Sequence, residues 1–264
     1  DTDVIVVGDI LANDNTGEAS GAAFIYRATD GFFQETQKLL ASDAAYLAYF
    51  GCSVGISGDI VVVGAYADDG APGAKSGAAY VFQDDGVRFT QAAKLTASDA
   101  GADDRFGETV AVSNNTVVVS ARYDADAGFA SDSGAAYVFF RTFDGSVSEA
   151  QKLTANNATA NERFGTSLAI SESGDVIVIG AWSGDDDQAG SAYSFVKSTP
   201  SSEPSSEPSS SSSGDKMSWL WFLVPIPLVL LVAFNVYFCR RKSSATKPVV
   251  AVDIELAVQP GFVR

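Results

Sequence analysis

The side chains of this sequence that offer chemistry are carboxylates, and they are grouped in loops that recur along the chain. The 264 residues include 33 acidic side chains and no histidine. Without histidine, neither Ser-His-Asp nor Cys-His catalysis is available, and no zinc or iron site can use an imidazole ligand. Two roles remain for the carboxylates: binding a hard cation, or hydrolysing a sugar bond through an acid–base pair.

The best local arrangement for a cation is Asp124-x-Asp126-x-Gly128, which Asp132 follows. Alternating carboxylates with a glycine at the turn suit Ca²⁺, which takes roughly six to eight oxygen ligands. The candidate ligands in the corresponding loops of other units are Asp68, Asp69, Asp185, Asp186 and Asp187. The local ligand count is below what Ca²⁺ requires, which favours the alternative interpretation of solvated acidic loops that aid solubility.

Catalysis by these carboxylates is the less favoured prediction, and the sequence indicates no catalytic residue. Acidic side chains recur in every unit, whereas a catalytic pair normally occurs once. A carboxylate-based glycoside hydrolase stays open as an alternative. Two carboxyl groups about 5 to 9 Å apart in a cleft of one unit only would identify it.

The acidic loops belong to a repeat. Phe-Gly recurs at Phe50-Gly51, Phe106-Gly107 and Phe164-Gly165, in steps of 56 and 58 residues, and Gly-(Ala/Ser)-Ala and Lys-Leu elements recur in phase with it. Each unit contains four short runs rich in Val, Ile, Phe and Tyr, with Gly, Asp, Asn and Ser between them, which is typical of strands and turns. The sequence therefore predicts an all-β fold, a propeller-like array of about four four-stranded blades, two of them partial.

This unit resembles the FG-GAP repeat of integrin α-subunit propellers and of related bacterial and algal surface proteins. Phe106-Gly107 opens the first strand, and Gly64-Ala65 or Gly180-Ala181 closes the second. The chain departs from the pattern at the third GAP position, which holds Tyr66, Arg122 or Trp182, at Ser120, and in lacking a DxDxDG calcium loop. The resemblance covers about residues 1–197 and implies extracellular recognition or adhesion.

Fourteen strands are expected, because the first unit begins at its second strand and the last ends at its third. Two interpretations follow. The chain is the C-terminal part of a longer propeller, or the two partial units are offset ends of a small ring. Propellers usually have about four to eight four-stranded blades, and fourteen strands do not divide into fours, so the first interpretation is favoured.

The composition changes after the repeats. Residues 198–216 are rich in Ser, Pro and Glu and are expected to form a disordered stalk. Residues 217–239 carry no charge, and as a helix they would extend about 35 Å, enough to cross a bilayer. Trp219, Trp221 and Tyr237 lie near the ends of this segment, as interfacial anchors do.

The charges predict the orientation in the membrane. Arg240, Arg241 and Lys242 follow the apolar segment, and positive charge marks the cytoplasmic side. We therefore expect a single-pass type I protein of the plasma membrane, with residues 1–197 outside and the tail 240–264 inside. The three basic residues would also favour anionic inner-leaflet lipids, and Cys239 is a candidate for palmitoylation.

Three further features bear on an extracellular role. Asn114 and Asn157 begin Asn-x-Thr glycosylation tripeptides in a predicted turn and a predicted loop. Tyr66, Tyr123 and Trp182 stand where a second strand meets its loop, either lining a binding face or, as favoured, packing between blades. We predict recognition of an unidentified extracellular protein or glycan, and a structural spacer of the cell wall or matrix stays open as an alternative.

Overall fold

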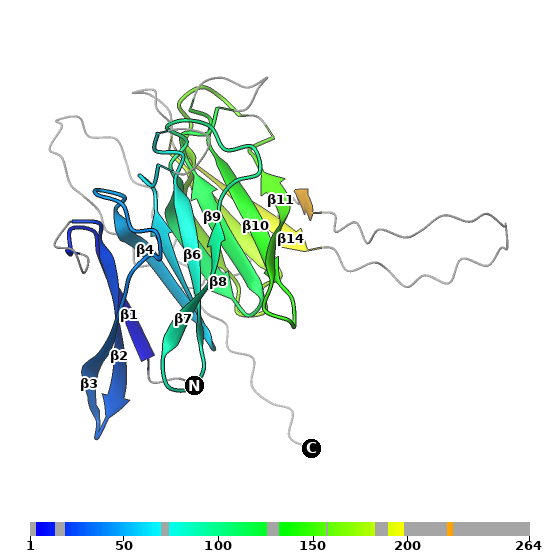
Figure 1. Ribbon diagram of the computed structural model, residues 1–264. Coiled ribbons are helices and arrows are strands. Elements are labelled where there is room, and N and C mark those ends of the chain that lie inside the picture. Colours follow the sequence, from blue (N-terminus) through cyan, green and yellow to red (C-terminus); the bar gives the residue numbers. More distant parts are fainter. Residues whose placement is uncertain are drawn as a thin grey trace, which may run out of the picture. The chain divides into compact units, whose positions relative to one another are not determined.

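A computed structural model describes residues 4–13, 19–69, 74–125, 132–156, 158–182 and 190–197, and the backbone of 221–223. The described residues form fifteen strands in four antiparallel sheets (Figure 1). Sheet 1 contains β1 (Val4–Asp9), β2 (Ala22–Thr29) and β3 (Phe32–Leu39). Sheet 2 contains β4 (Phe50–Ser57), β5 (Ile60–Ala65), β6 (Ala78–Asp84) and β7 (Phe89–Leu95). Sheet 3 contains β8 (Phe106–Ser113), β9 (Thr116–Ala121), β10 (Ala135–Arg141) and β11 (Val147–Leu153). Sheet 4 contains β12 (Phe164–Ile170), β13 (Val176–Ala181), β14 (Ser191–Lys197) and β15 (Trp221–Leu223).

The predicted repeat of short strands is confirmed, with one sheet for each unit and consecutive strands as neighbours. Tight turns at Ser57-Gly58 and at Asn114-Asn115, the second of which was predicted, join β4 to β5 and β8 to β9. Gly58 and Asn114 have positive φ angles of 57° and 51°, a conformation that Gly and Asn tolerate better than other residues. The described part of the chain is thus consistent with a propeller-like array of blades.

The fifteenth strand was not predicted. Residues Trp221–Leu223, expected within a transmembrane helix, instead pair antiparallel with Phe195–Lys197 of β14. They take the position that β7 and β11 occupy in sheets 2 and 3, where an open edge would leave backbone N–H and C=O groups unpaired. Across the described residues, no helix is both long and apolar enough to cross a membrane. The rest of 217–239 lies outside the described residues.

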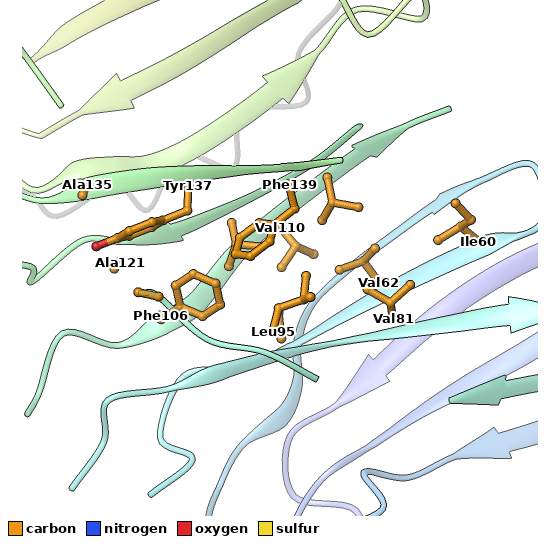
Figure 2. Packing of buried hydrophobic residues seen from close by; sticks show 14 residues of the cluster. Ile60, Val62, Val81, Leu95, Phe106, Val110, Ala121, Ala135, Tyr137 and Phe139 are labelled. Carbon is orange, nitrogen blue, oxygen red and sulfur yellow. The ribbon is translucent and has the colours of Figure 1, made fainter. Parts of the chain in front are cut away.

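The hydrophobic core lies between successive sheets, because every strand alternates its side chains between two faces. Between sheets 2 and 3, Val62, Val81 and Leu95 face Phe106 and Tyr137 (Figure 2). Equivalent clusters join sheet 1 to sheet 2 and sheet 3 to sheet 4. Each inner sheet is therefore buried on both faces, which explains the continuous apolar runs of β5 and β9.

The phenylalanine of each Phe-Gly pair anchors its own sheet. Phe106 is fully buried and meets the rings of Tyr137 and Phe139 edge to face, at centroid distances of 5.4 and 5.9 Å. Phe50 and Phe164 make the same contacts in sheets 2 and 4. An edge-to-face pair contributes about 0.5 to 1.5 kcal/mol beyond the burial of its area.

The glycine of each pair is required by a close approach of two sheets. Gly107 has a φ angle of 94°, and a Cβ built there would lie 2.0 Å from the carbonyl oxygen of Ala78 in sheet 2. Gly77 and Gly134 also lie at close approaches, since their Cβ positions would fall 2.0 and 2.3 Å from the carbonyl oxygens of Phe106 and Phe164.

Candidate functional site

Two predicted cation ligands, Asp68 and Asp124, are members of a cluster that we call the carboxylate clamp. In sheet 2 the clamp consists of Asp43, Asp68, Tyr80 and Lys94. The Tyr80 hydroxyl donates to Asp43 at 2.8 Å and lies 2.7 Å from Asp68. The Lys94 ammonium donates to the same two carboxylates at 2.7 and 2.9 Å. Each carboxylate is thereby held by one tyrosine and one lysine, both from neighbouring strands.

Sheet 3 contains the same clamp, built from Asp99, Asp124, Tyr137 and Lys152. Tyr137 lies 2.7 Å from Asp99 and 2.6 Å from Asp124. Lys152 lies 2.7 Å from Asp99 and 3.0 Å from both oxygens of Asp124. The carboxylate pair occurs in two sheets, and in each sheet one lysine bridges both carboxylates. The arrangement therefore fits a structural role, in which it connects the loop after the second strand to the loop before the first strand.

The described residues of the two outer sheets show other contacts at the positions of the clamp. In sheet 4, Tyr193 bonds Glu162 at 2.6 Å. In sheet 1, Phe24 replaces the tyrosine, and Lys38 instead donates to the backbone oxygen of Asn13. Sheet 1 therefore provides a natural comparison in which the lysine is present without the hydrogen-bonded tyrosine.

Burial and hydrogen bonds shift the pKa values of the clamp side chains. Partial burial alone would raise the pKa of Asp99, but hydrogen bonds from Lys152 and Tyr137 outweigh it and lower that pKa. Burial dominates for Asp124, which is only 4% exposed, and raises its pKa despite the same two partners. Burial, followed by the hydrogen bond to Asp124, also raises the pKa of Tyr137.

We expect alkaline pH to destabilise the fold through the tyrosines. Burial and the bond to Glu162 raise the pKa of Tyr193 to about 12 from its ordinary value of 10.0, and the pKa values of Tyr80 and Tyr137 are raised for similar reasons. Above about pH 10 the unfolded chain loses phenolic protons that the folded chain retains, so stability falls as pH rises through 12. Melting temperatures between pH 8 and 11.5 should decline, and Tyr137→Phe should reduce the slope. A flat profile would contradict the assignment.

The predicted calcium ligands are not brought together in the described part of the chain. Asp68 and Asp124 are held in the clamps, and Asp69 accepts the backbone N–H of Lys75 at 2.9 Å. Asp132 has a positive φ angle of 58° and its backbone oxygen accepts the N–H of Arg163. No group of three or more carboxylates or thiols is placed to hold a metal among the described residues. Asp126, Asp185, Asp186 and Asp187 lie outside them.

A second cluster links three sheets at the same ends of their strands. We call it the arginine–aromatic ladder, and its members are Tyr66, Arg105, Glu108, Arg122, Tyr123, Arg163 and Trp182. The Arg105 guanidinium stacks between Tyr66 of sheet 2, at 5.7 Å, and Tyr123 of sheet 3, at 4.3 Å. Arg163 likewise stacks between Tyr123, at 5.2 Å, and Trp182 of sheet 4, at 5.1 Å. The aromatic side chains thus pack against the neighbouring blade, while Trp182 stays 56% exposed.

The ladder carries an excess of positive charge. Arg122 stacks on Tyr123 at 4.9 Å, and its Nε lies 2.7 Å from Glu108 Oε2, an ion pair that lacks hydrogen-bond geometry. Burial raises the pKa of Glu108, although the charges of all three arginines oppose this effect. Arg105 and Arg163 have no hydrogen bond or ion pair from their guanidinium groups to any other described residue. Among the residues that the structure describes, three guanidinium groups thus share one carboxylate.

Sequence reasoning selected the aromatic members of the ladder but missed Arg105, Arg163 and Glu108. A signal was present, because Tyr49, Arg105 and Arg163 occupy the same position, directly before each Phe-Gly pair. All three have φ angles between 53° and 56°. That left-handed conformation, uncommon for such residues, places the side chains at equivalent points of successive sheets.

Of the two predicted glycosylation residues, Asn114 lies in the described part of the chain. Asn114 is exposed in its turn, but its Nδ2 donates to the backbone oxygen of Glu172 at 2.7 Å. Cys52 is half-buried, its thiol lies 3.2 Å from the Gly107 oxygen, and burial raises its pKa to about 12. Asn157, Cys239 and the basic residues Arg240, Arg241 and Lys242 lie outside the described residues.

Comparison with solved structures adds little about function. One matching structure is the periplasmic gluconolactonase PpgL of Pseudomonas aeruginosa, at 15% identity over 72% of this chain and 65% of that one. The TM-score is 0.28, too low to carry an argument. This chain spans less than two thirds of that protein. No curated protein matches the chain.

The sequence profile of the FG-GAP repeat matches residues 33–82, 89–139 and 147–195. Each match begins in the last strand of one sheet and ends in the third strand of the next, so that one family repeat joins two sheets. The close approach at each Phe-Gly pair lies inside these matches, which together cover more than half of the 264 residues. The chain belongs to the FG-GAP repeat family.

Proposed function

We propose that the chain is a cell-surface recognition protein that binds acidic groups of an extracellular glycan through the arginine–aromatic ladder. The observation that carries this proposal is the stacking of Arg105 and Arg163 between aromatic rings of three sheets. Stacking occupies the faces of a guanidinium and leaves its in-plane N–H donors for a carboxylate or sulfate.

The surroundings support an acidic ligand over a basic one. Residues 1–214 have 11 basic and 30 acidic side chains, yet in the described part of the ladder three arginines meet one carboxylate. The exposed Trp182 ring adds an apolar surface beside the charge. A uronate presents both a carboxylate and a sugar ring, and these two groups suit an arginine and an aromatic side chain.

The rest of the chain suggests where recognition takes place. We propose that the uncharged residues that follow β15, 224–239, anchor the protein in the plasma membrane, and that 240–264 faces the cytoplasm. The basic cluster at 240–242 supports this orientation. Adhesion is then the natural consequence of binding a polymer held by another cell or by a matrix.

Binding of alginate, a polyuronate, tests the proposal. The full chain in detergent micelles is expected to bind immobilised alginate and not dextran, a neutral polymer, and to release alginate as salt rises. Arg105→Gln and Arg163→Gln should each weaken binding about ten- to hundredfold, since a hydrogen bond to a charged group contributes about 1.5 to 3 kcal/mol.

Arg88→Gln is the matched control. This variant removes the same charge from an exposed turn between β6 and β7, which lies at the opposite ends of the strands from the ladder. It should leave alginate binding within twofold. Equal loss in all three variants would indicate a general charge effect and overturn the site. Equal binding of dextran and alginate would overturn the ligand class.

A further inference from the structure

The ladder is part of a longer row of stacked side chains that crosses three sheets. Tyr49 directly precedes the Phe50-Gly51 pair, as Arg105 and Arg163 precede theirs. Its ring stacks on that of Tyr66 at a centroid distance of 5.2 Å and an interplanar angle of 15°. The contacts therefore order the row as Tyr49, Tyr66, Arg105, Tyr123, Arg163 and Trp182. Such a row, which runs from sheet 2 to sheet 4, suits an extended ligand.

Two cations of the row are equivalent and lie close together. The guanidinium carbons of Arg105 and Arg163 lie 4.3 and 5.2 Å from the centroid of the Tyr123 ring, so they are at most 9.5 Å apart. Both arginines are half-buried and have left-handed φ angles, 56° and 53°. Nε of Arg163 is buried and has no hydrogen-bond partner in the described part of the chain. The row thus offers two similar groups of N–H donors beside one ring.

The separation of the two guanidinium groups fits the spacing of acidic groups along a glycan. With covalent bonds of about 1.5 Å, carboxylates on neighbouring or alternate sugars of a polyuronate lie roughly 5 to 10 Å apart. A single uronate has one carboxylate and can fill one of the two places. When one group of a chain has bound, the next is held near the second guanidinium, which raises the overall affinity by about a hundred- to ten-thousandfold.

We propose that the ladder holds two acidic groups of one glycan chain at once, one at Arg105 and the other at Arg163. This inference rests on the proposed function and names its ligand more closely: an oligomer with acidic groups on nearby sugars, and not a single acidic sugar. Arg122 is not a third place of this kind, because its Nε already lies 2.7 Å from a carboxylate oxygen of Glu108.

Competition for immobilised alginate tests the inference. The full chain in detergent micelles is mixed with a monouronate or with its hexamer, and the inhibiting concentrations are compared per uronate group. The hexamer is expected to compete at least about a hundredfold more effectively. Equal competition per uronate, with alginate binding that still depends on both arginines, would overturn the inference and leave the proposed function standing. No binding of alginate at all would overturn both.

Single substitutions should abolish the preference for the hexamer. Arg105→Gln and Arg163→Gln each leave one place, so in either variant the hexamer should compete within about threefold of the monouronate per uronate group. Arg88→Gln, the exposed control, should retain the full preference. A preference that survives in both variants of the row would contradict simultaneous binding at Arg105 and Arg163.

Tyr49→Arg tests the row by a gain of binding. The φ angle of Tyr49 is 55°, close to those of Arg105 and Arg163, so an arginine fits this backbone. The new guanidinium would lie beside Tyr66, next in the row to Arg105, and should tighten hexamer binding about tenfold and dimer binding about twofold or less. Tyr49→Gln removes the ring without adding charge and should give no gain. A hexamer that gains no more than the dimer would contradict an extended ligand along the row.

Discussion

Gly107→Ala is expected to reduce the free energy of unfolding by about 4 kcal/mol or more, which is among the largest effects of a single substitution. Its Cβ would lie 2.0 Å from the Ala78 oxygen and 3.1 Å from the Ala65 nitrogen, so the backbones of sheets 2 and 3 would have to separate. The φ angle of 94° adds strain for any residue with a Cβ. Denaturant unfolding of the variant and the parent chain measures the effect.

Gly86→Ala separates the two causes. Gly86 has a nearly identical φ angle of 90°, but a Cβ there meets no atom within 4 Å. This variant should lose only the cost of the backbone conformation, about 1 to 2 kcal/mol. If the two glycine variants lost the same stability, the close approach of the sheets would contribute nothing, and our explanation of the Phe-Gly pair would be wrong.

Lys152→Met should cost about 2 to 3 kcal/mol of folding stability. The substitution keeps the apolar stem and removes the cation that lies 2.7 Å from Asp99 and 3.0 Å from Asp124. Loss of one partner from a buried ion pair costs about 3 to 5 kcal/mol, and we expect less here because the Asp99 side chain is 45% exposed and can be hydrated. Thermal and denaturant unfolding at neutral pH provide the measurement.

Lys38→Met is the control within the same repeat. Lys38 occupies the equivalent position of sheet 1, but it is exposed, and Phe24 stands where the clamp has tyrosine. We expect a loss of about 0.5 kcal/mol or less, as for most surface substitutions. A loss at Lys38 equal to that at Lys152 would show that the lysine acts through its stem and not through the two carboxylates.

These predictions separate the family's general design from the features of this chain. Gly107 tests the close approach that recurs at every Phe-Gly pair. Lys152 tests the carboxylate clamp, which among the described residues is complete in sheets 2 and 3. Neither residue belongs to the ladder. Stability measurements can therefore be interpreted independently of ligand binding.

The sequence by itself determined the repeat, the number of strands in each unit and their approximate boundaries. Strand periodicity and turn residues are local signals, so β5, β9 and the turn at Asn114 could be predicted from short stretches.

The tertiary structure alone decided which loop residues meet. Lys152 binds Asp99, 53 residues earlier, and Arg105 stacks on Tyr66, 39 residues earlier, and no local periodicity links such positions. The sequence shows the charges of Asp68 and Asp124, but not that Lys94 and Lys152 lie beside them. The strand at Trp221–Leu223 was missed for a related reason, since its pairing depends on the unpaired edge of β14 and not on its own composition.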